Sequence, residues 1–210
     1  MTLRRYVSPR GPHSAETKVE GSRFIADLFP AVSEEEAKAH LASVRKRYFD
    51  ATHHCYAYAI GAGPETVRYS DDGEPNGTAG LKIHSVLRSR TISDAVCIVT
   101  RYFGGTKLGV GGLGRAYSDA AAAAVDGAAM FDKGVLARLR VAYTYDHTNA
   151  VMNTVQSRSL RIAGTEYDAE RTMLTLLVPP DDVDAVMQRL VDATRGAAEC
   201  ERQGESAVAL

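Results

Sequence analysis

The chain has 210 residues, of which 45% are hydrophobic and 24% are charged, and its formal net charge is -1. These values match ordinary globular proteins, so they exclude extensive disorder, and the near-zero charge excludes a protein that binds polyanions over its whole surface. The three cysteines are odd in number and contain no C-x-x-C pair, which argues against a disulfide framework and against a cysteine-rich zinc site.

The first part of the chain is expected to mix strands and helices. Ser33 and Glu36 form a capping box, which predicts that a helix begins there. Hydrophobic spacing and glycine or proline breaks define the other elements. In chain order they are a frayed start or edge strand at 1–17, a strand at 18–29, a helix from Ser33 to about Tyr48, a hairpin of 52–60 and 65–69 around 61–64, a helix at 79–88, a buried strand at 95–103 and an alanine-rich helix at 111–127.

The last part of the chain has a different spacing of apolar residues, and residues 127–134 are the expected boundary between the two domains. From Val135 to Tyr145 the odd positions are apolar, which is typical of a half-buried strand. The remaining expected elements are a helix at 148–159, strands at 161–168 and 171–178, a helix that follows Pro179 and Pro180, and a strand at 198–210. This βαββαβ order in about 75 residues predicts a ferredoxin-like domain.

A glycine-rich segment, residues 101–115, stands between the buried strand and the alanine-rich helix. Glycine lets a ligand approach the backbone closely, and the free N–H groups at a helix start attract anions. Three cations in the same segment favour an anion or phosphate site over a turn that only packs strand against helix. The residues predicted to bind the anion or nucleic acid are Arg101, Gly104, Gly105, Lys107, Gly111, Gly112 and Arg115.

A second unusual segment, residues 71–80, contains the carboxylates Asp71, Asp72 and Glu74. Three carboxylates within four residues could hold Mg²⁺ or act as acid and base. They could equally cap N–H groups in a turn, with Thr78 as the N-cap of the next helix. We favour a structural role in which they pair with the arginines of the glycine-rich segment, and we predict no metal and no cofactor.

Two histidines and a thiol follow one another at His53, His54 and Cys55. Strand alternation sends His53 and Cys55 to one face and His54 to the other, so the three cannot bind one metal together. We expect a histidine that is hydrogen-bonded to the backbone, with His53 as a partner of the acidic segment. A Cys–His nucleophile pair is disfavoured, because apolar and aromatic neighbours would raise the pKa of Cys55.

These segments closely resemble the signature blocks of the YigZ/IMPACT family. The blocks are His53-His54-Cys55, Ser70 to Pro75 with Gly77 to Gly80, and Thr100 to Tyr117, within about residues 18–127. The tail resembles the ferredoxin-like domain of bacterial YigZ-type members. Two positions depart from the pattern: Lys82 stands where we associate proline with the family, and Gly114 where we associate an aliphatic residue.

The resemblance implies a two-layer α+β protein with two domains. Residues 1–133 are expected to adopt the fold of ribosomal protein S5 domain 2, in which helices cover one face of a sheet. Residues 134–210 are expected to form the ferredoxin-like domain. The shared surface implied by the resemblance contains the acidic segment and the glycine-rich segment.

Three functions remain open from the sequence. We favour a binding protein over an enzyme, with RNA or the ribosome as the partner and a role in translation regulation. The alternatives are an enzyme that acts on a phosphorylated small molecule or nucleotide, and a regulator that binds a protein partner. Eukaryotic members of the family use an additional N-terminal domain, so we do not carry their partner mechanism over. Because no signal peptide or membrane-spanning run is visible, we expect a cytoplasmic location without membrane contact.

Overall fold

The computed structural model describes residues 5–62 and 66–210. It divides into two compact units: unit 1 contains residues 1–133 and 209–210, and unit 2 contains residues 134–208. The predicted turn at 61–64 and the predicted strand at 65–69 fall partly outside the described residues, as does the start of the segment predicted at 1–17. None of the helices formed by the described residues is long and apolar enough to cross a membrane.

Unit 1 is built on a five-stranded antiparallel sheet in the order β2-β3-β6-β4-β5. The central strand β6 is an apolar run that is almost entirely buried, as expected for a strand covered on both faces. Val7 of β1 also forms a parallel bridge to Ile92, outside this sheet. The elements of unit 1 are β1 (Arg5–Pro9), β2 (His13–Val19), β3 (Ser22–Pro30), α1 (Glu34–Arg47), β4 (His53–Ala59), β5 (Val67–Ser70), α2 (Gly80–Ser89), β6 (Ala95–Tyr102) and α3 (Gly109–Gly127).

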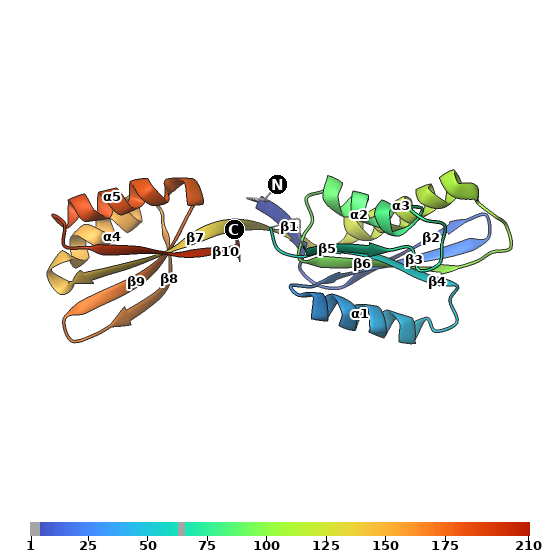
Figure 1. Cartoon of the computed structure of the whole chain (residues 1–210), viewed down its shortest axis with the longest axis horizontal. Coiled ribbons are helices and arrows are strands. Elements are labelled where there is room, and N and C mark those ends of the chain that lie inside the picture. Colours follow the sequence, from blue (N-terminus) through green and yellow to red (C-terminus); the bar gives the residue numbers. More distant parts are fainter. Residues whose placement is uncertain (1–4, 63–65) are drawn as a thin grey trace. The chain divides into compact units, whose positions relative to one another are not determined.

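Helices cover both faces of this sheet (Figure 1). On one face α2 and α3, with Leu113 of α3 among the buried side chains, pack over Phe24 and Cys97 in the larger core cluster. On the other face α1 packs its buried Ala37 and Val44 against Phe29 and neighbouring residues in a smaller cluster. The predicted α+β class holds, but α1 adds a layer to the one-sided arrangement that the S5 resemblance implied.

The capping box of α1 and the β2–β3 hairpin show where local sequence patterns predict the structure correctly and where they do not. Glu36 N–H donates to Ser33 Oγ at 3.2 Å, so the predicted start of α1 is confirmed. The strand predicted at 18–29 is wrong in its first part, because β2 and β3 meet in a two-residue turn there. Glu20 and Gly21 both have positive φ, 47° and 79°, which is the backbone of a tight hairpin turn.

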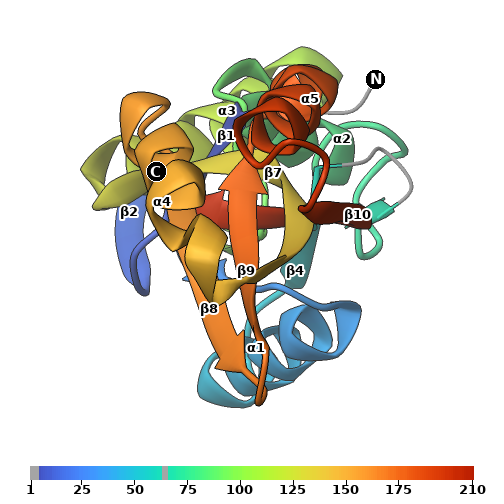
Figure 2. The same cartoon turned by 90° about the vertical axis from the view of Figure 1, so that its left-hand side faces the viewer.

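Unit 2 has the predicted βαββαβ order (Figures 1 and 2). Within this unit the strands run in the order β8-β9-β7-β10. The helices α4 and α5 pack on one face, where their Val151 and Leu190 join Leu139 of the sheet in the core. The expected boundary segment 127–134 contains the end of α3 and the start of β7 at Met130. The elements are β7 (Met130–Thr144), α4 (Thr148–Ser157), β8 (Arg161–Tyr167), β9 (Arg171–Val178), α5 (Val183–Ala193) and β10 (Glu199–Ala209).

Candidate functional site

Asp71 follows β5 and its carboxylate caps the start of α2. Oδ1 accepts hydrogen bonds from the N–H groups of Ala79 and Gly80, each at 2.9 Å, and Oδ2 accepts one from Gly77 at 2.9 Å. These bonds satisfy helix-terminal donors that have no partner within the helix. The prediction that Thr78 is the N-cap is wrong, because the N-cap of α2 is Ala79 and the Thr78 hydroxyl donates instead to the Pro75 carbonyl at 2.6 Å. Asp71 therefore has a structural role.

Asp72 ties the same segment to β4 and to α1. Its Oδ2 accepts from the backbone N–H of His54 at 2.7 Å, and its Oδ1 accepts from Arg45 Nη2 at 2.8 Å. Asp72 has a φ of 44°, in the left-handed region that aspartate tolerates better than most residues. Both of its oxygens are thus engaged, and the cation it neutralises is Arg45.

Glu74, Arg101 and Tyr117 form a buried hydrogen-bonded group that joins the acidic segment to the glycine-rich segment. Glu74 Oε1 accepts from Arg101 Nη1 at 2.7 Å and from the Tyr117 hydroxyl at 2.8 Å. The side chains of Glu74 and Arg101 are only 4% and 7% exposed. Burial, and then the neighbouring Cys55 and Glu74, raise the pKa of Tyr117, so its hydroxyl stays protonated and donates.

Arg101 is therefore placed differently from the surface cation that the sequence suggested. Besides its bond to Glu74, its guanidinium lies 5.5 Å from the ring centroids of both Phe24 and Phe103. The acidic and glycine-rich segments are in contact through Glu74, and the ion pair between Glu74 and Arg101 neutralises the charge of Arg101. Among the described residues, no group of three or more histidine, cysteine or acidic side chains is arranged to hold a metal ion.

The two histidines and the thiol lie on the faces predicted by strand alternation. His53 Nδ1 lies 2.8 Å from the Asp72 carbonyl oxygen, which assigns the ring proton to Nδ1, and Nε2 lies 3.9 Å from Glu74 Oε1. His54 bonds Tyr48 on the α1 side, and burial lowers its pKa. Cys55 donates to the Asp71 carbonyl at 3.0 Å, and burial raises its pKa, so this thiol is not a ready nucleophile.

The start of α3 is the open helix end of unit 1. Its N-cap residue is Leu108, and no side chain of the described residues accepts a capping hydrogen bond from the N–H groups there. The first turn of α3 contains no acidic residue. By contrast Ser33 caps α1, and Asp71 caps α2. Lys107 and Arg115 are exposed on either side of this start. Free N–H groups with adjacent cations are the arrangement that binds phosphate and other anions.

Not every glycine of the segment is arranged for a ligand. A Cβ at Gly104 would lie 1.9 Å from the carbonyl carbon of Gly21, so this glycine lets the segment pack on the β2–β3 turn. Its N–H donates to Ser22 Oγ at 3.1 Å. Gly105 and Gly111 have no heavy atom within 4 Å of such a Cβ, so both face open space. Gly112 meets only the Leu108 side chain, at 3.4 Å.

A pocket of about 370 Å³ lies between the start of α2 and the first turns of α3. Two cations, Lys82 and Arg115, contribute to its wall. The alkyl chain of Lys82 lies over Gly114, where a Cβ would be 3.1 Å from Lys82 Cε. Its lining residues are Asn76, Gly77, Thr78, Lys82, Val110, Gly111, Gly114, Arg115 and Ser118.

The sequence prediction overlooked Lys82, Asn76 and Tyr117. The glycine-rich start of α3 is visible in the sequence, but no local sequence pattern shows that the start of α2 lies beside it. Lys82 is in the first turn of α2, three residues from Ala79, and a lysine at the dipole's positive end is unusual. That placement, together with the departure from the family pattern at Lys82, could have marked it as a site residue.

Comparisons with known proteins agree with this architecture. The model of the Impact N-terminal domain matches residues 20–125, and the model of a domain of unknown function (DUF1949) matches residues 141–197. A relative described as IMPACT family member YvyE, from Bacillus subtilis, is 30% identical over 97% of this chain and 93% of its own length. IMPACT family member YigZ from Escherichia coli is 30% identical over 93% of this chain and 96% of its own length.

A solved structure has the same fold over nearly the whole chain. This crystal structure, of a protein described only as hypothetical, is 30% identical in sequence and superposes with a TM-score of 0.64. The likeness covers 94% of this chain and 97% of the solved chain. The two-domain α+β arrangement is thus shared with an experimentally determined relative.

Proposed function

The chain belongs to the IMPACT family, and from that premise we propose that unit 1 binds RNA, as part of a role at the ribosome in translation regulation. The contact is a backbone phosphate held at the start of α3. The observation that carries the proposal is the uncapped N-terminus of α3 with Lys107 and Arg115 beside it. The protein in this role is a binding module, and its affinity comes chiefly from phosphate contacts.

The distribution of neighbouring charges supports this assignment. Asp72 pairs with Arg45 and Glu74 pairs with Arg101, so these carboxylates do not neutralise the cations around the pocket. The third carboxylate, Asp71, is turned toward the positive end of α2. Lys82, Lys107 and Arg115 therefore face solvent at one helix start, where each adds attraction for a polyanion.

The proposed contact set differs from the one that the sequence suggested. Gly105, Lys107, Gly111, Gly112 and Arg115 stay in it, and Lys82 joins them. Arg101 and Gly104 leave it, since the first pairs with buried Glu74 and the second packs on Gly21. Asp71, Asp72, Glu74 and His53 hold the segments in place and do not touch the ligand.

A second candidate function is supported by the pocket itself. Its volume of about 370 Å³ falls within the range of small-molecule sites. A phosphorylated small molecule would place its phosphate at the same helix start. Saturable binding of a mononucleotide, competed by inorganic phosphate and insensitive to RNA length, would favour this candidate over RNA.

Cosedimentation of the full chain with ribosomes across a salt series tests the proposal. Three substitutions, Lys82→Ala, Lys107→Ala and Arg115→Ala, are combined in one variant, because all three side chains are exposed and their removal leaves the core intact. The control variant removes three exposed cations elsewhere in unit 1: Lys18, Lys38 and Arg88. We expect release of the first variant at lower salt, with the slope of log K against log salt reduced by about 2. Equal behaviour of both variants, or no sedimentation at low salt, would reject the phosphate site.

A further inference from the structure

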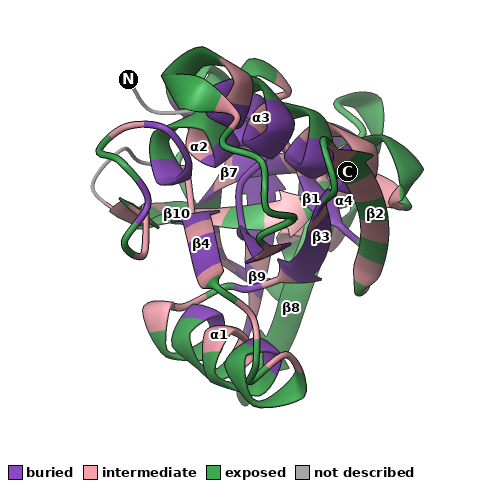
Figure 3. Ribbon diagram, turned by 90° about the vertical axis from the view of Figure 1, so that its right-hand side faces the viewer, coloured by how far each residue is buried: buried purple, intermediate pink, exposed green. Residues whose placement is uncertain are grey.

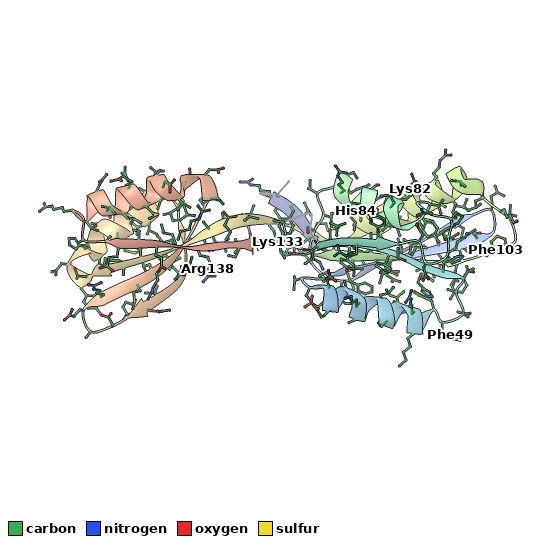
Figure 4. All side chains as sticks on the ribbon, viewed as in Figure 1. Phe49, Lys82, His84, Phe103, Lys133 and Arg138 are labelled. Carbon is green, nitrogen blue, oxygen red and sulfur yellow. The ribbon has the colours of Figure 1, made fainter. Side chains whose placement is uncertain are left out.

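One end of unit 1 exposes aromatic side chains that the proposed phosphate site does not use. Phe49 is 84% exposed and Phe103 is 49% exposed. Figure 4 shows both at the same end of the unit, with the Phe49 side chain pointing away from the end of α1. Figure 3 looks onto this end of unit 1. We call Phe49, Tyr102 and Phe103 the aromatic end of unit 1.

These side chains are held on a fixed support. The turn that carries Phe49 is fastened to β6 by three hydrogen bonds. Thr52 N–H donates to the Arg101 carbonyl at 2.9 Å, Phe103 N–H donates to Thr52 Oγ1 at 3.2 Å, and the Tyr102 hydroxyl donates to Asp50 at 2.8 Å. Because the turn and the strand end are joined, the aromatic end is arranged before a ligand arrives.

Cations lie beside two of the three rings. The Arg23 guanidinium stacks over the Tyr102 ring at 4.5 Å, and that of Arg101 lies 5.5 Å from the centroid of Phe103. The last turn of α1, directly before Phe49, carries Arg45, Lys46 and Arg47. Several of these charges have carboxylate partners: Asp72 for Arg45, Asp27 for Arg47 and Glu16 for Arg23. The local positive charge is thus modest, and the exposed rings are the larger feature.

Exposed aromatic rings beside cations form the kind of surface on which unpaired bases stack. Single-stranded nucleic acid stacks its bases on aromatic side chains, and every base has a face that can stack. In a duplex the bases are already stacked on one another and present only their edges. A protein partner would bury these rings too, but it would make no use of the phosphate site that follows Phe103 in the chain.

The chain connects this end directly to the phosphate site. Phe103 stands four residues before Lys107 and six before Gly109, the first residue of α3. Six residues span at most about 21 Å of chain. One RNA strand of a few nucleotides can therefore touch Phe103 and the start of α3 at the same time.

We propose that the RNA bound by unit 1 is single-stranded, with bases stacked on Phe103 and Phe49 and a neighbouring phosphate at the start of α3. This inference rests on the proposed function for its phosphate contact. It adds a specificity that the phosphate site lacks, because phosphate contacts alone do not distinguish single strands from duplexes. Stacking also persists at salt concentrations that weaken phosphate contacts.

Fluorescence anisotropy on the full chain tests the inference. The probe is a labelled RNA of about 12 nucleotides without secondary structure, within the site sizes of single-strand-binding folds. The same strand annealed to its complement is the comparison. The test variants are Phe49→Ala and the double variant Phe49→Ala with Phe103→Ala. The control is Tyr167→Ala, which removes an exposed aromatic ring from unit 2.

We expect the wild type to prefer the single strand and to lose affinity by about tenfold for each ring removed, with Tyr167→Ala unchanged. Removing Phe103 could disturb Arg101, which lies beside its ring. The single variant Phe49→Ala avoids this problem, because the Phe49 ring is 84% exposed and contributes little to folding. Equal binding of single strand and duplex, with the phenylalanine variants like wild type, would overturn the inference and leave the phosphate site standing. Failure to bind either RNA at low salt would remove the proposed function as well.

Discussion

The buried pair of Glu74 and Arg101 should be a main determinant of the stability of unit 1. Glu74→Gln preserves the shape of the side chain and an oxygen that can accept from Tyr117, but it removes the charge beside Arg101. Arginine stays protonated, so its guanidinium would remain charged, with its side chain only 7% exposed and no counter-charge. Breaking a buried pair in this way costs about 3–5 kcal/mol, and we expect the loss for Glu74→Gln at the lower end of that range.

Urea denaturation followed by circular dichroism measures the loss, and amide hydrogen exchange in β4 and β6 assigns it to unit 1. Arg101→Met should cost a similar amount. The double variant Glu74→Gln with Arg101→Met should cost less than the sum of the two by about 2 kcal/mol, since it leaves no unpaired charge. Asp126→Asn is the matched control, because it breaks an exposed pair with Arg90 (2.9 Å) and should cost under about 1 kcal/mol. A Glu74→Gln loss no larger than that of the control would refute the reasoning.

Three further predictions concern the same unit. Burial alone would raise the pKa of Asp94, but hydrogen bonds from Lys133, the Gly61 amide and Tyr6 outweigh it and hold that pKa below its usual value. The resulting stabilisation is present above the ordinary aspartate pKa and is lost as pH falls through the lowered one, so the stability gap between wild type and Asp94→Asn should shrink in acid denaturation series. Gly104→Ala should lower the melting temperature by placing a Cβ 1.9 Å from the Gly21 backbone, whereas Gly111→Ala, in open space, should raise stability by up to about 1 kcal/mol. Asp71→Ala should cost about 2 kcal/mol in urea titrations because three N–H groups lose their acceptor, and a cost near zero would contradict the capping role.

Elements with local signals were predictable from the sequence, and those that depend on an unusual turn residue were not. The start of α1 is set by Ser33 and Glu36, whose side chains each accept a backbone hydrogen bond at that end of the helix. The β2–β3 turn places Glu20 at positive φ, where asparagine, aspartate or glycine is typical. Because that signature is missing, the strand predicted at 18–29 ran through the turn, whereas the edge strand offered for 1–17 agrees with β2 at the edge of the sheet.

The sequence predicted which segments form the site, but not which role each side chain has within it. Alternation along β6 puts Arg101 on the face of Ala95, Cys97 and Val99, which packs under α2 and α3. Both faces of β6 are covered, however, so residues 95–99 are apolar without alternation, and the sequence does not show which side chains of this strand stay in solvent. The partner of Arg101 lies 27 residues away at Glu74, and no local pattern joins the two.

Lys82 and Gly114, the two positions at which the sequence departs from the pattern it resembles, are neighbours in space. Glycine inside a helix costs up to about 1 kcal/mol relative to alanine, so Gly114 alone weakens α3. The missing Cβ makes room for the Lys82 alkyl chain, whose Cε, Cγ and Cδ would lie 3.1, 3.7 and 3.8 Å from that atom. Packing of this stem on α3 recovers apolar contact and carries the ammonium to the pocket wall beside Arg115. Lys82 and Gly114 therefore form one packing unit, which places an additional cation at the start of α3.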